Sequence, residues 1–77
     1  MENKLFRTNQ EFADYLERLG FVEVSEKIFP DKPGKRAFKR KRFHLYFDYI
    51  NISISKNAGI IYNAPEISVS ELERLIS

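Results

Sequence analysis

The sequence predicts a small α+β domain, in which a three- to four-stranded antiparallel sheet accompanies an N-terminal helix and a short C-terminal helix. Apolar residues recur with helical spacing near each end of the 77-residue chain, and between these ends they alternate with period two. Turn residues separate the alternating segments. We therefore expect one small globular domain, residues 1–77, in the order α-β-β-β(-β)-α, with helices over about residues 8–19 and 69–76.

The first helix is predicted by signals at both of its ends. Thr8 and Glu11 have the spacing of a capping box, in which each side chain bonds the backbone N–H of the other residue. Gly20 supplies the left-handed residue that ends the helix, and Phe21 follows at the position that completes a Schellman motif. Between these ends one helical face is apolar: Phe12, Tyr15, Leu16 and Leu19.

The C-terminal helix begins in the same way. Ser68 and Glu71 form a second capping box, and Ile67 and Leu72 occupy the positions of a hydrophobic staple. The apolar residues of this segment fall on one helical face: Val69, Leu72, Leu75 and Ile76.

The segments between the helices are predicted to be strands. Residues 21–29 form the first strand, and the loop after it has Pro33-Gly34 at the centre of a type II turn. Residues 36–49 form a long second strand. Residues 52–63 form a hairpin, whose two short strands are joined by the four-residue loop 56–59.

The long strand has the alternation of a strand with one buried face. Phe43, Leu45, Phe47 and Tyr49 alternate with polar residues and should face the core. After Tyr49 the parity of the apolar residues changes, which indicates a bulge or a turn over residues 49–51. The predicted core collects residues from both helices and from the sheet: Phe12, Leu16, Leu19, Val22, Val24, Phe43, Leu45, Phe47, Leu72 and Leu75.

Composition excludes several classes of protein. An apolar fraction of 43% with 14% aromatic residues is typical of a folded chain. The chain contains no cysteine, which excludes disulfides and cysteine-based zinc sites and fits a reducing compartment. No apolar run approaches the length of a membrane span, and residues 1–6 lack the apolar core of a signal peptide. We therefore expect a cytoplasmic protein without a membrane partner.

The predicted order of elements resembles the double-stranded-RNA-binding fold. The opening of helix, Gly20, Phe21 and strand, together with the short final helix, also loosely resembles HicA-type mRNA-cleaving toxins. The catalytic histidine of the toxin family has no counterpart, because the first strand continues into Glu26-Lys27-Ile28. The basic motif that the RNA-binding family carries at its last helix is also absent, since residues 68–75 are acidic.

One stretch concentrates the positive charge. The chain has a net charge of +2, and residues 35–42 contain six basic side chains, which leaves −4 for the rest. Such a segment attracts the backbone of DNA or RNA, or an acidic protein surface. On a single long strand, Arg40, Arg42, His44 and Tyr46 would share the solvent face, so that charge lies beside aromatic rings. The candidate nucleic-acid-binding residues are Lys35, Arg36, Lys39, Arg40, Lys41, Arg42, His44 and Tyr46.

Three other interpretations of these residues stay open. Charges along an exposed edge strand also discourage aggregation, and a basic run can be a solvated face. Phe38, Tyr46, Ile50 and Ile61 have the parity opposite to the core, which favours an accessory or inhibitor module that binds a protein through its sheet, or a homodimer. A cluster of Arg42, His44 and Tyr46 is the minor alternative, an RNA-cleaving toxin-like site.

The chemistry of the remaining side chains favours a binding protein over an enzyme. His44 is the single histidine, and Asp48 would lie about 13 Å along the same strand, too far to share a metal ion. The three glycines occupy turn positions and form no phosphate-binding loop. We therefore predict no catalytic residues, no metal and no cofactor.

Overall fold

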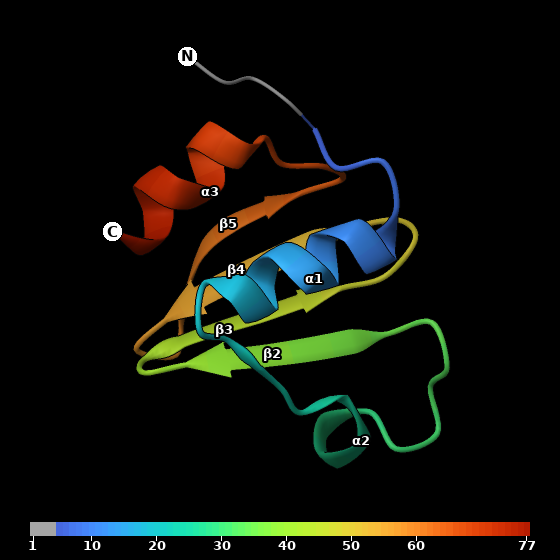
Figure 1. The fold of residues 1–77 in the computed structure, drawn as a ribbon. Coiled ribbons are helices and arrows are strands. Elements are labelled where there is room, and N and C mark those ends of the chain that lie inside the picture. Colours follow the sequence, from blue (N-terminus) through green and yellow to red (C-terminus); the bar gives the residue numbers. More distant parts are fainter. Residues whose placement is uncertain (1–4) are drawn as a thin grey trace.

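The computed structural model describes residues 5–77. Residues 1–4, which belong to the segment predicted not to be a signal peptide, lie outside the described residues. The chain has an α+β fold, with one antiparallel sheet of five strands in the order β1-β2-β3-β4-β5 (Figure 1). The fold class is as predicted, with five strands in place of three to four. The elements are α1 Asn9–Arg18, β1 Val22–Glu23, α2 Ser25–Ile28, β2 Arg36–Arg40, β3 Phe43–Phe47, β4 Ile52–Lys56, β5 Gly59–Ala64 and α3 Val69–Ile76.

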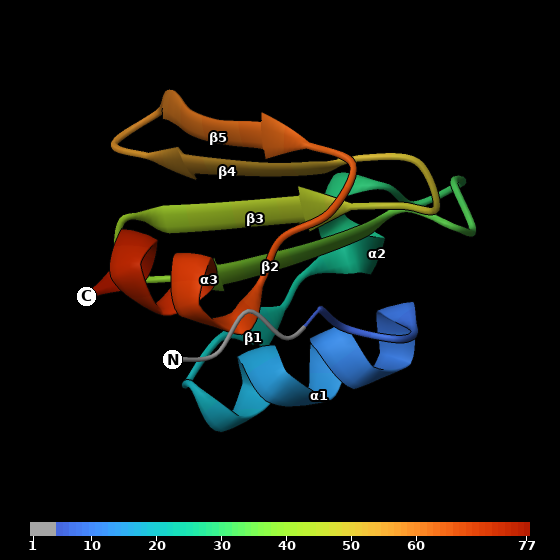
Figure 2. The same cartoon turned by 90° about the horizontal axis from the view of Figure 1, so that it is seen from above.

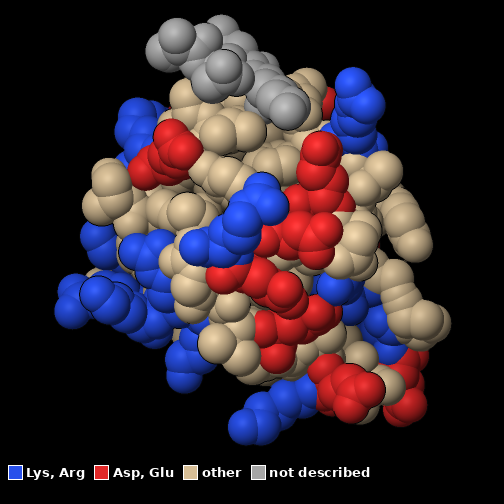
Figure 3. All heavy atoms as spheres, in the orientation of Figure 1, with Lys and Arg blue, Asp and Glu red and all other residues tan. Residues whose placement is uncertain are grey.

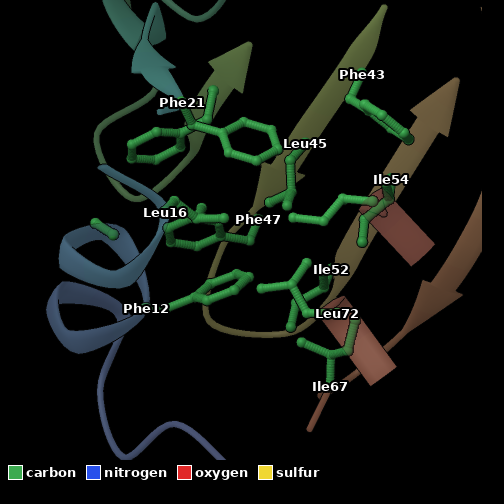
Figure 4. Close-up of a cluster of buried hydrophobic side chains, with 13 residues drawn as sticks. Phe12, Leu16, Phe21, Phe43, Leu45, Phe47, Ile52, Ile54, Ile67 and Leu72 are labelled. Atoms are coloured by element: carbon green, nitrogen blue, oxygen red, sulfur yellow. The ribbon is translucent and has the colours of Figure 1, made fainter. Parts of the chain in front are cut away.

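One face of the sheet carries the hydrophobic core, and α1 and α3 both contribute to it (Figure 4). The register of the strands determines which side chains the sheet contributes to the core. Phe38, Leu45 and Ile54 lie opposite one another on β2, β3 and β4. All three side chains are fully buried, together with Leu16 of α1 and Leu72 of α3. Most of the predicted core is confirmed, and Leu19 and Leu75 pack at its margin.

Helix α1 begins and ends where the sequence predicts. The Thr8 hydroxyl accepts a bond of 3.0 Å from the Glu11 N–H, and the Glu11 carboxylate accepts one from the Arg7 N–H, one residue earlier than expected. At the other end, Gly20 has a φ of +96° and the Phe21 N–H donates to the Leu16 carbonyl at 3.0 Å. That 6→1 bond is the Schellman motif.

Helix α3 is also confirmed, with Ser68 as its N-cap. The Ser68 hydroxyl accepts a bond of 3.2 Å from the Glu71 N–H. Ile67 and Leu72 are both buried in the same cluster, as a staple requires. The Tyr15 hydroxyl donates to the Glu73 carboxylate at 2.5 Å and so joins α1 to α3.

The prediction of one long strand over residues 36–49 is wrong. The segment forms two strands, β2 and β3, and the chain reverses at Lys41-Arg42 so that Arg40 pairs with Phe43. Lys41 makes this turn with a φ of 56°, and no glycine or proline marks it in the sequence. Because the turn resets the parity, Phe38 is fully buried and does not face solvent.

The predicted burial of Tyr49 is wrong as well, since its side chain is 85% exposed. The predicted change of parity is a turn that connects β3 to β4. The Asp48 carboxylate holds this turn by accepting bonds of 2.8 and 2.9 Å from the N–H groups of Ile50 and Asn51. Its pKa is lowered from the ordinary value, chiefly by these two backbone bonds.

The predicted strand over residues 21–29 is correct only at its start. Strand β1 ends at Glu23, and α2 follows from Ser25. The Ser25 hydroxyl accepts a 2.9 Å bond from the Ala37 N–H, in place of the backbone partner that a longer strand would supply. Val22 was expected in the core but is 63% exposed, because it lies opposite Lys39 on the sheet face away from α1 and α3. Val24 is half-buried.

The last hairpin is present with a shorter loop than predicted. Strands β4 and β5 continue through Lys56 and Gly59, which pair directly. Asn57 and Ala58 form the turn with φ angles of 54° and 69°, the combination that matches the twist of the flanking strands. The predicted type II turn at Pro33-Gly34 is confirmed by a positive φ at Gly34 and a 3.1 Å bond from the Lys35 N–H to the Lys32 carbonyl. Among residues 5–77, no helix has the length and apolar character needed to cross a bilayer.

Candidate nucleic-acid interface

The structure divides the eight predicted binding residues among different parts of the sheet. Arg36 and Arg40 lie on the face that α1 covers, and Lys35 lies at the opposite end of β2 from Lys41. The rest remain on the outer face or in the β2–β3 turn: Lys39, Lys41, Arg42, His44 and Tyr46.

Arg36 has a structural role. Its guanidinium donates two bonds to the Glu23 carboxylate, at 2.8 and 2.9 Å, and a third to the Gln10 side chain at 3.2 Å. The guanidinium also lies over the rings of Phe38 and Phe47, at 5.7 and 6.0 Å. The bonds from Arg36 lower the pKa of Glu23 from its ordinary value. Arg36 therefore connects β1, β2 and α1, and each of its three nitrogens donates one hydrogen bond within the protein.

Arg40 also faces the helices, contrary to the prediction that it shares the solvent face with His44 and Tyr46. Its Nη1 donates to the Leu19 carbonyl at 3.1 Å, and its guanidinium lies 5.5 Å from the centre of the Phe21 ring. A cation at this position stabilises the negative C-terminal end of α1. The turn at Lys41-Arg42 explains the error, because it ends the parity on which the prediction depended.

Lys35 is exposed, and its charge is already paired. Its Nζ lies 3.2 Å from the Asp48 carboxylate and 5.9 Å from the centre of the Phe29 ring. The ion pair joins the start of β2 to the end of β3, at the far end of the sheet from Lys41. Lys35 therefore does not belong to the same patch as the turn residues.

Lys39, Lys41 and Arg42 lie at the same end of the sheet as a fourth basic side chain, Lys56, which the sequence analysis missed. Lys56 pairs with Phe43 across β3 and β4, and the Asn57 N–H donates to the Arg42 carbonyl at 3.1 Å. Figure 2 shows the β2–β3 and β4–β5 turns at the same end of the sheet. Alternate hairpin turns of a meander always meet in this way, which is the signal that could have identified Lys56. We call Lys39, Lys41, Arg42 and Lys56 the basic end.

The charges of the basic end are not neutralised within the described chain. No carboxylate of residues 5–77 lies within 4.0 Å of these four side chains. Figure 3 shows Lys and Arg gathered at the edge where the β2–β3 turn lies, whereas Asp and Glu gather over the face that α1 covers. The charges of the protein are therefore separated in space as well as in sequence.

The sheet face away from α1 and α3 carries two aromatic rings on its central strand. The rings of His44 and Tyr46 are inclined by only 12°, with centroids 6.3 Å apart, and the Phe29 ring meets Tyr46 edge-on at 5.9 Å. Across β4, His44 lies opposite Ser55 and Tyr46 lies opposite Ser53. We call this surface the open face. A hollow of about 140 Å³ lies beside Tyr46, and Phe29, Asn51 and Ser53 contribute to its lining.

The predicted cleavage cluster is only partly assembled. His44 and Tyr46 lie together on β3, but Arg42 is in the turn, and no hydrogen bond links these three side chains in the described structure. Within residues 5–77, no group of three or more His, Asp or Glu side chains has the arrangement of a metal site.

The fold and the two surfaces therefore have to be interpreted from their own geometry. A comparison of the chain with protein-family models, with curated proteins and with solved structures finds no match.

Proposed function

We propose that the protein is a non-enzymatic, cytoplasmic nucleic-acid-binding protein that contacts the phosphate backbone through the basic end. The observation that supports this proposal is that four cations without a carboxylate partner in residues 5–77 lie at one end of the sheet. Lys39 stands on the open face, Lys41 and Arg42 are in the turn between β2 and β3, and Lys56 lies 5.6 Å from the centre of the Phe43 ring on the other face of β4. Each cation that neutralises a phosphate releases condensed counterions, and this release is the main source of sequence-independent affinity.

The other basic residues of the predicted site differ from the basic end, because their side chains already have partners within the protein. Arg36 and Lys35 already have carboxylate partners, and Arg40 donates to a helix carbonyl. Lys39, Lys41, Arg42 and Lys56 are exposed and have no such partners in residues 5–77. Separation from the acidic face of α1 preserves the positive potential of this end of the molecule.

A salt series tests the proposal. The double variant Lys41→Gln/Arg42→Gln should bind a labelled 12-mer more weakly and reduce the slope of log K against log salt by about 0.7 per lost phosphate contact on a single strand, or about 0.9 on a duplex. Fluorescence anisotropy at several salt concentrations measures this slope. When the 12-mer is RNA, it should be recovered uncleaved after the measurement. Arg40 is kept because it holds the end of α1.

The matched control is Lys27→Gln/Lys32→Gln, which removes the same charge from exposed positions in α2 and in the loop after it. The control should retain nearly the full slope. If the wild-type protein fails to bind at low salt, or if both double variants lose affinity equally, the basic end is not the binding site.

A second candidate function, self-association, is favoured by the outer edge of the sheet. Strand β5 is an edge strand of six residues that contains no charged side chain. Ile60 is 67% exposed and Ile61 is 40% exposed. An uncharged edge with exposed β-branched residues is the kind of surface that pairs with another strand.

A further inference from the structure

We infer that the ligand is single-stranded nucleic acid, which lies across the open face with its bases stacked on Tyr46 and His44 and its backbone on the basic end. This inference depends on the proposed function, and it specifies which form of nucleic acid the protein selects. Unpaired bases expose flat surfaces that aromatic side chains can cover, whereas a duplex hides those surfaces within its own stack.

The position of the two rings supports stacking. Both come from β3, the central strand, and they stand on the side of the sheet away from α1 and α3. Their near-parallel planes offer two neighbouring surfaces to successive bases, 6.3 Å apart between centroids. Both side chains are half-buried, so the sheet supports them while part of each ring remains accessible.

Tyr46 is held in place before any ligand arrives. The Phe29 ring contacts it edge-on, and Phe29 is itself fixed by α2, since its N–H donates to the Ser25 carbonyl at 2.7 Å. A ring that is already ordered loses little conformational entropy on binding. The hollow of about 140 Å³ beside Tyr46 leaves space next to the ring.

Small polar groups lie on the β4 and β5 side of the rings. Ser53 and Ser55 lie directly across β4, and Asn63 lies opposite Ser53 on β5. The serine hydroxyls can both donate and accept, and the Asn63 Nδ2 can donate while its Oδ1 accepts from Asn51, so these side chains can bond the edges of different bases. Contacts of this kind accompany stacking in proteins that bind single strands with little sequence preference.

Lys39 connects the open face to the basic end. It pairs with His44 across β2 and β3, and Lys41 follows two residues later in the turn. A strand whose bases rest on Tyr46 and His44 therefore has phosphates beside Lys39 and, further along, beside the turn. One continuous path joins the aromatic and the basic parts of the site.

Four probes of equal length test the inference with the wild-type protein. These are a single-stranded DNA 12-mer, the same sequence as RNA, its duplex, and a 12-mer of abasic residues that keeps the phosphates and lacks the bases. The two single strands should bind at least about fivefold more tightly than the abasic strand, because each stacked base contributes about fivefold to about 150-fold. The single strands should also bind more tightly than the duplex at matched salt.

Variants separate stacking from charge. Tyr46→Leu keeps an apolar contact with Phe29 and should lower the affinity for single strands by about fivefold or more, with unchanged affinity for the abasic strand. Tyr46→Phe should behave as the wild type. The control is Tyr49→Leu, which removes an 85% exposed ring from the turn after β3 and should change nothing.

The outcomes distinguish this inference from the proposed function. Equal binding of the abasic strand and the single strands overturns the stacking inference, and so does equal or tighter binding of the duplex. In either case the proposed function stands if Lys41→Gln/Arg42→Gln still weakens binding. The comparison of probes requires only the wild-type protein, so it remains decisive even if Tyr46→Leu fails to fold. Absence of binding to all four probes overturns both.

Discussion

Lys41 and Ala58 each turn the chain through the left-handed region, with φ angles of 56° and 69°. A residue with a side chain pays about 1–2 kcal/mol for that conformation, and glycine avoids the steric part of the cost. At position 58 no contact in the described structure offsets the cost of the left-handed conformation. At position 41 it keeps an exposed cation at the tip of the β2–β3 turn, where the proposed interface requires one.

We predict that Lys41→Gly and Ala58→Gly both stabilise the protein, by about 1 kcal/mol or somewhat less after the entropy of glycine is counted. For a domain of this size that corresponds to a rise in Tm of about 4–8 °C per kcal/mol. Thermal unfolding followed by circular dichroism measures both changes. Only Lys41→Gly should also weaken binding to the single-stranded 12-mer.

Ala58→Gly serves as the control for the change in backbone conformation, because it leaves the charge unaltered. A Lys41→Gly variant that gains stability and keeps full affinity would show that the cation at position 41 is not used. Loss of stability in both variants would contradict the strain assigned to these turns.

The two terminal helices depend on the sheet and on each other. Helices of 10 and 8 residues are too short to be stable alone in water, so packing on the core must hold α1 and α3. Tyr15 and Glu73 provide the side-chain hydrogen bond between them, at 2.5 Å. Burial, followed by the bond to Glu73 and its charge, raises the pKa of Tyr15 to about 12.

This pKa predicts a dependence of stability on alkaline pH. Between about pH 10 and pH 12 the unfolded chain releases the Tyr15 proton and the folded protein retains it, so the free energy of unfolding falls as pH rises. Tyr15→Phe should be less stable by about 1 kcal/mol at pH 7, because the hydrogen bond is lost. The difference between the two proteins should then narrow as pH approaches 12.

Urea unfolding of both proteins at pH 7, 10 and 11.5 measures the difference between their free energies of unfolding at each pH. At pH 7 this difference should be about 1 kcal/mol. Both proteins contain the same lysines, so the titration of lysine cancels in the difference between their free energies of unfolding. A difference that stays constant over this range would show that Tyr15 does not titrate in the way its partners imply.

At the scale of the whole molecule, charge is distributed unevenly over the edges and faces of the sheet. Acidic groups lie over α1, cations gather at the turns, and β5 has neither (Figure 3). The opposite edge is formed by β1, a strand of two residues that is followed at once by α2. The two edges therefore differ, because short strands resist pairing with another chain whereas β5 has no such protection.

If β5 mediates self-association, a charge on that edge should prevent it. We predict that the wild-type protein forms a concentration-dependent dimer and that Ile60→Lys is a monomer, because a lysine on an edge opposes strand pairing. Sedimentation equilibrium across a wide range of protein concentration measures both. Ile60 is 67% exposed, so the substitution should leave the fold intact.

Ile50→Lys is the matched control, since it makes the same change at a side chain that is 77% exposed in the β3–β4 turn. The control should dimerise like the wild type. A wild-type protein that stays monomeric at millimolar concentration rules out the β5 dimer. Equal loss of dimerisation in Ile60→Lys and Ile50→Lys would indicate general charge repulsion.

Local signals predicted the two terminal helices and much of the core correctly, whereas α2 was predicted to be part of a strand. The caps at Thr8 and Ser68 and the stop at Gly20 act within a few residues, so sequence spacing contains the whole of their physics. Period-two alternation placed Phe43, Leu45 and Phe47 in the core for the same reason. Alternation failed for Phe38 and Arg40, because a turn without glycine or proline separates them from β3.

The sequence by itself therefore determined the class of fold, the two terminal helices and the presence of a dense basic segment. Only the tertiary structure decided which cations remain available. Pairing of β1 with β2 placed Arg36 beside Glu23, and packing of α1 on the sheet placed Arg40 beside the Leu19 carbonyl. Pairing of β3 with β4 brought Lys56 to the end of the sheet that holds Lys41 and Arg42, from a distant part of the chain. The physical reason is that hydrogen bonds and ion pairs between strands depend on register, and register is set by the closing of turns and the burial of one face.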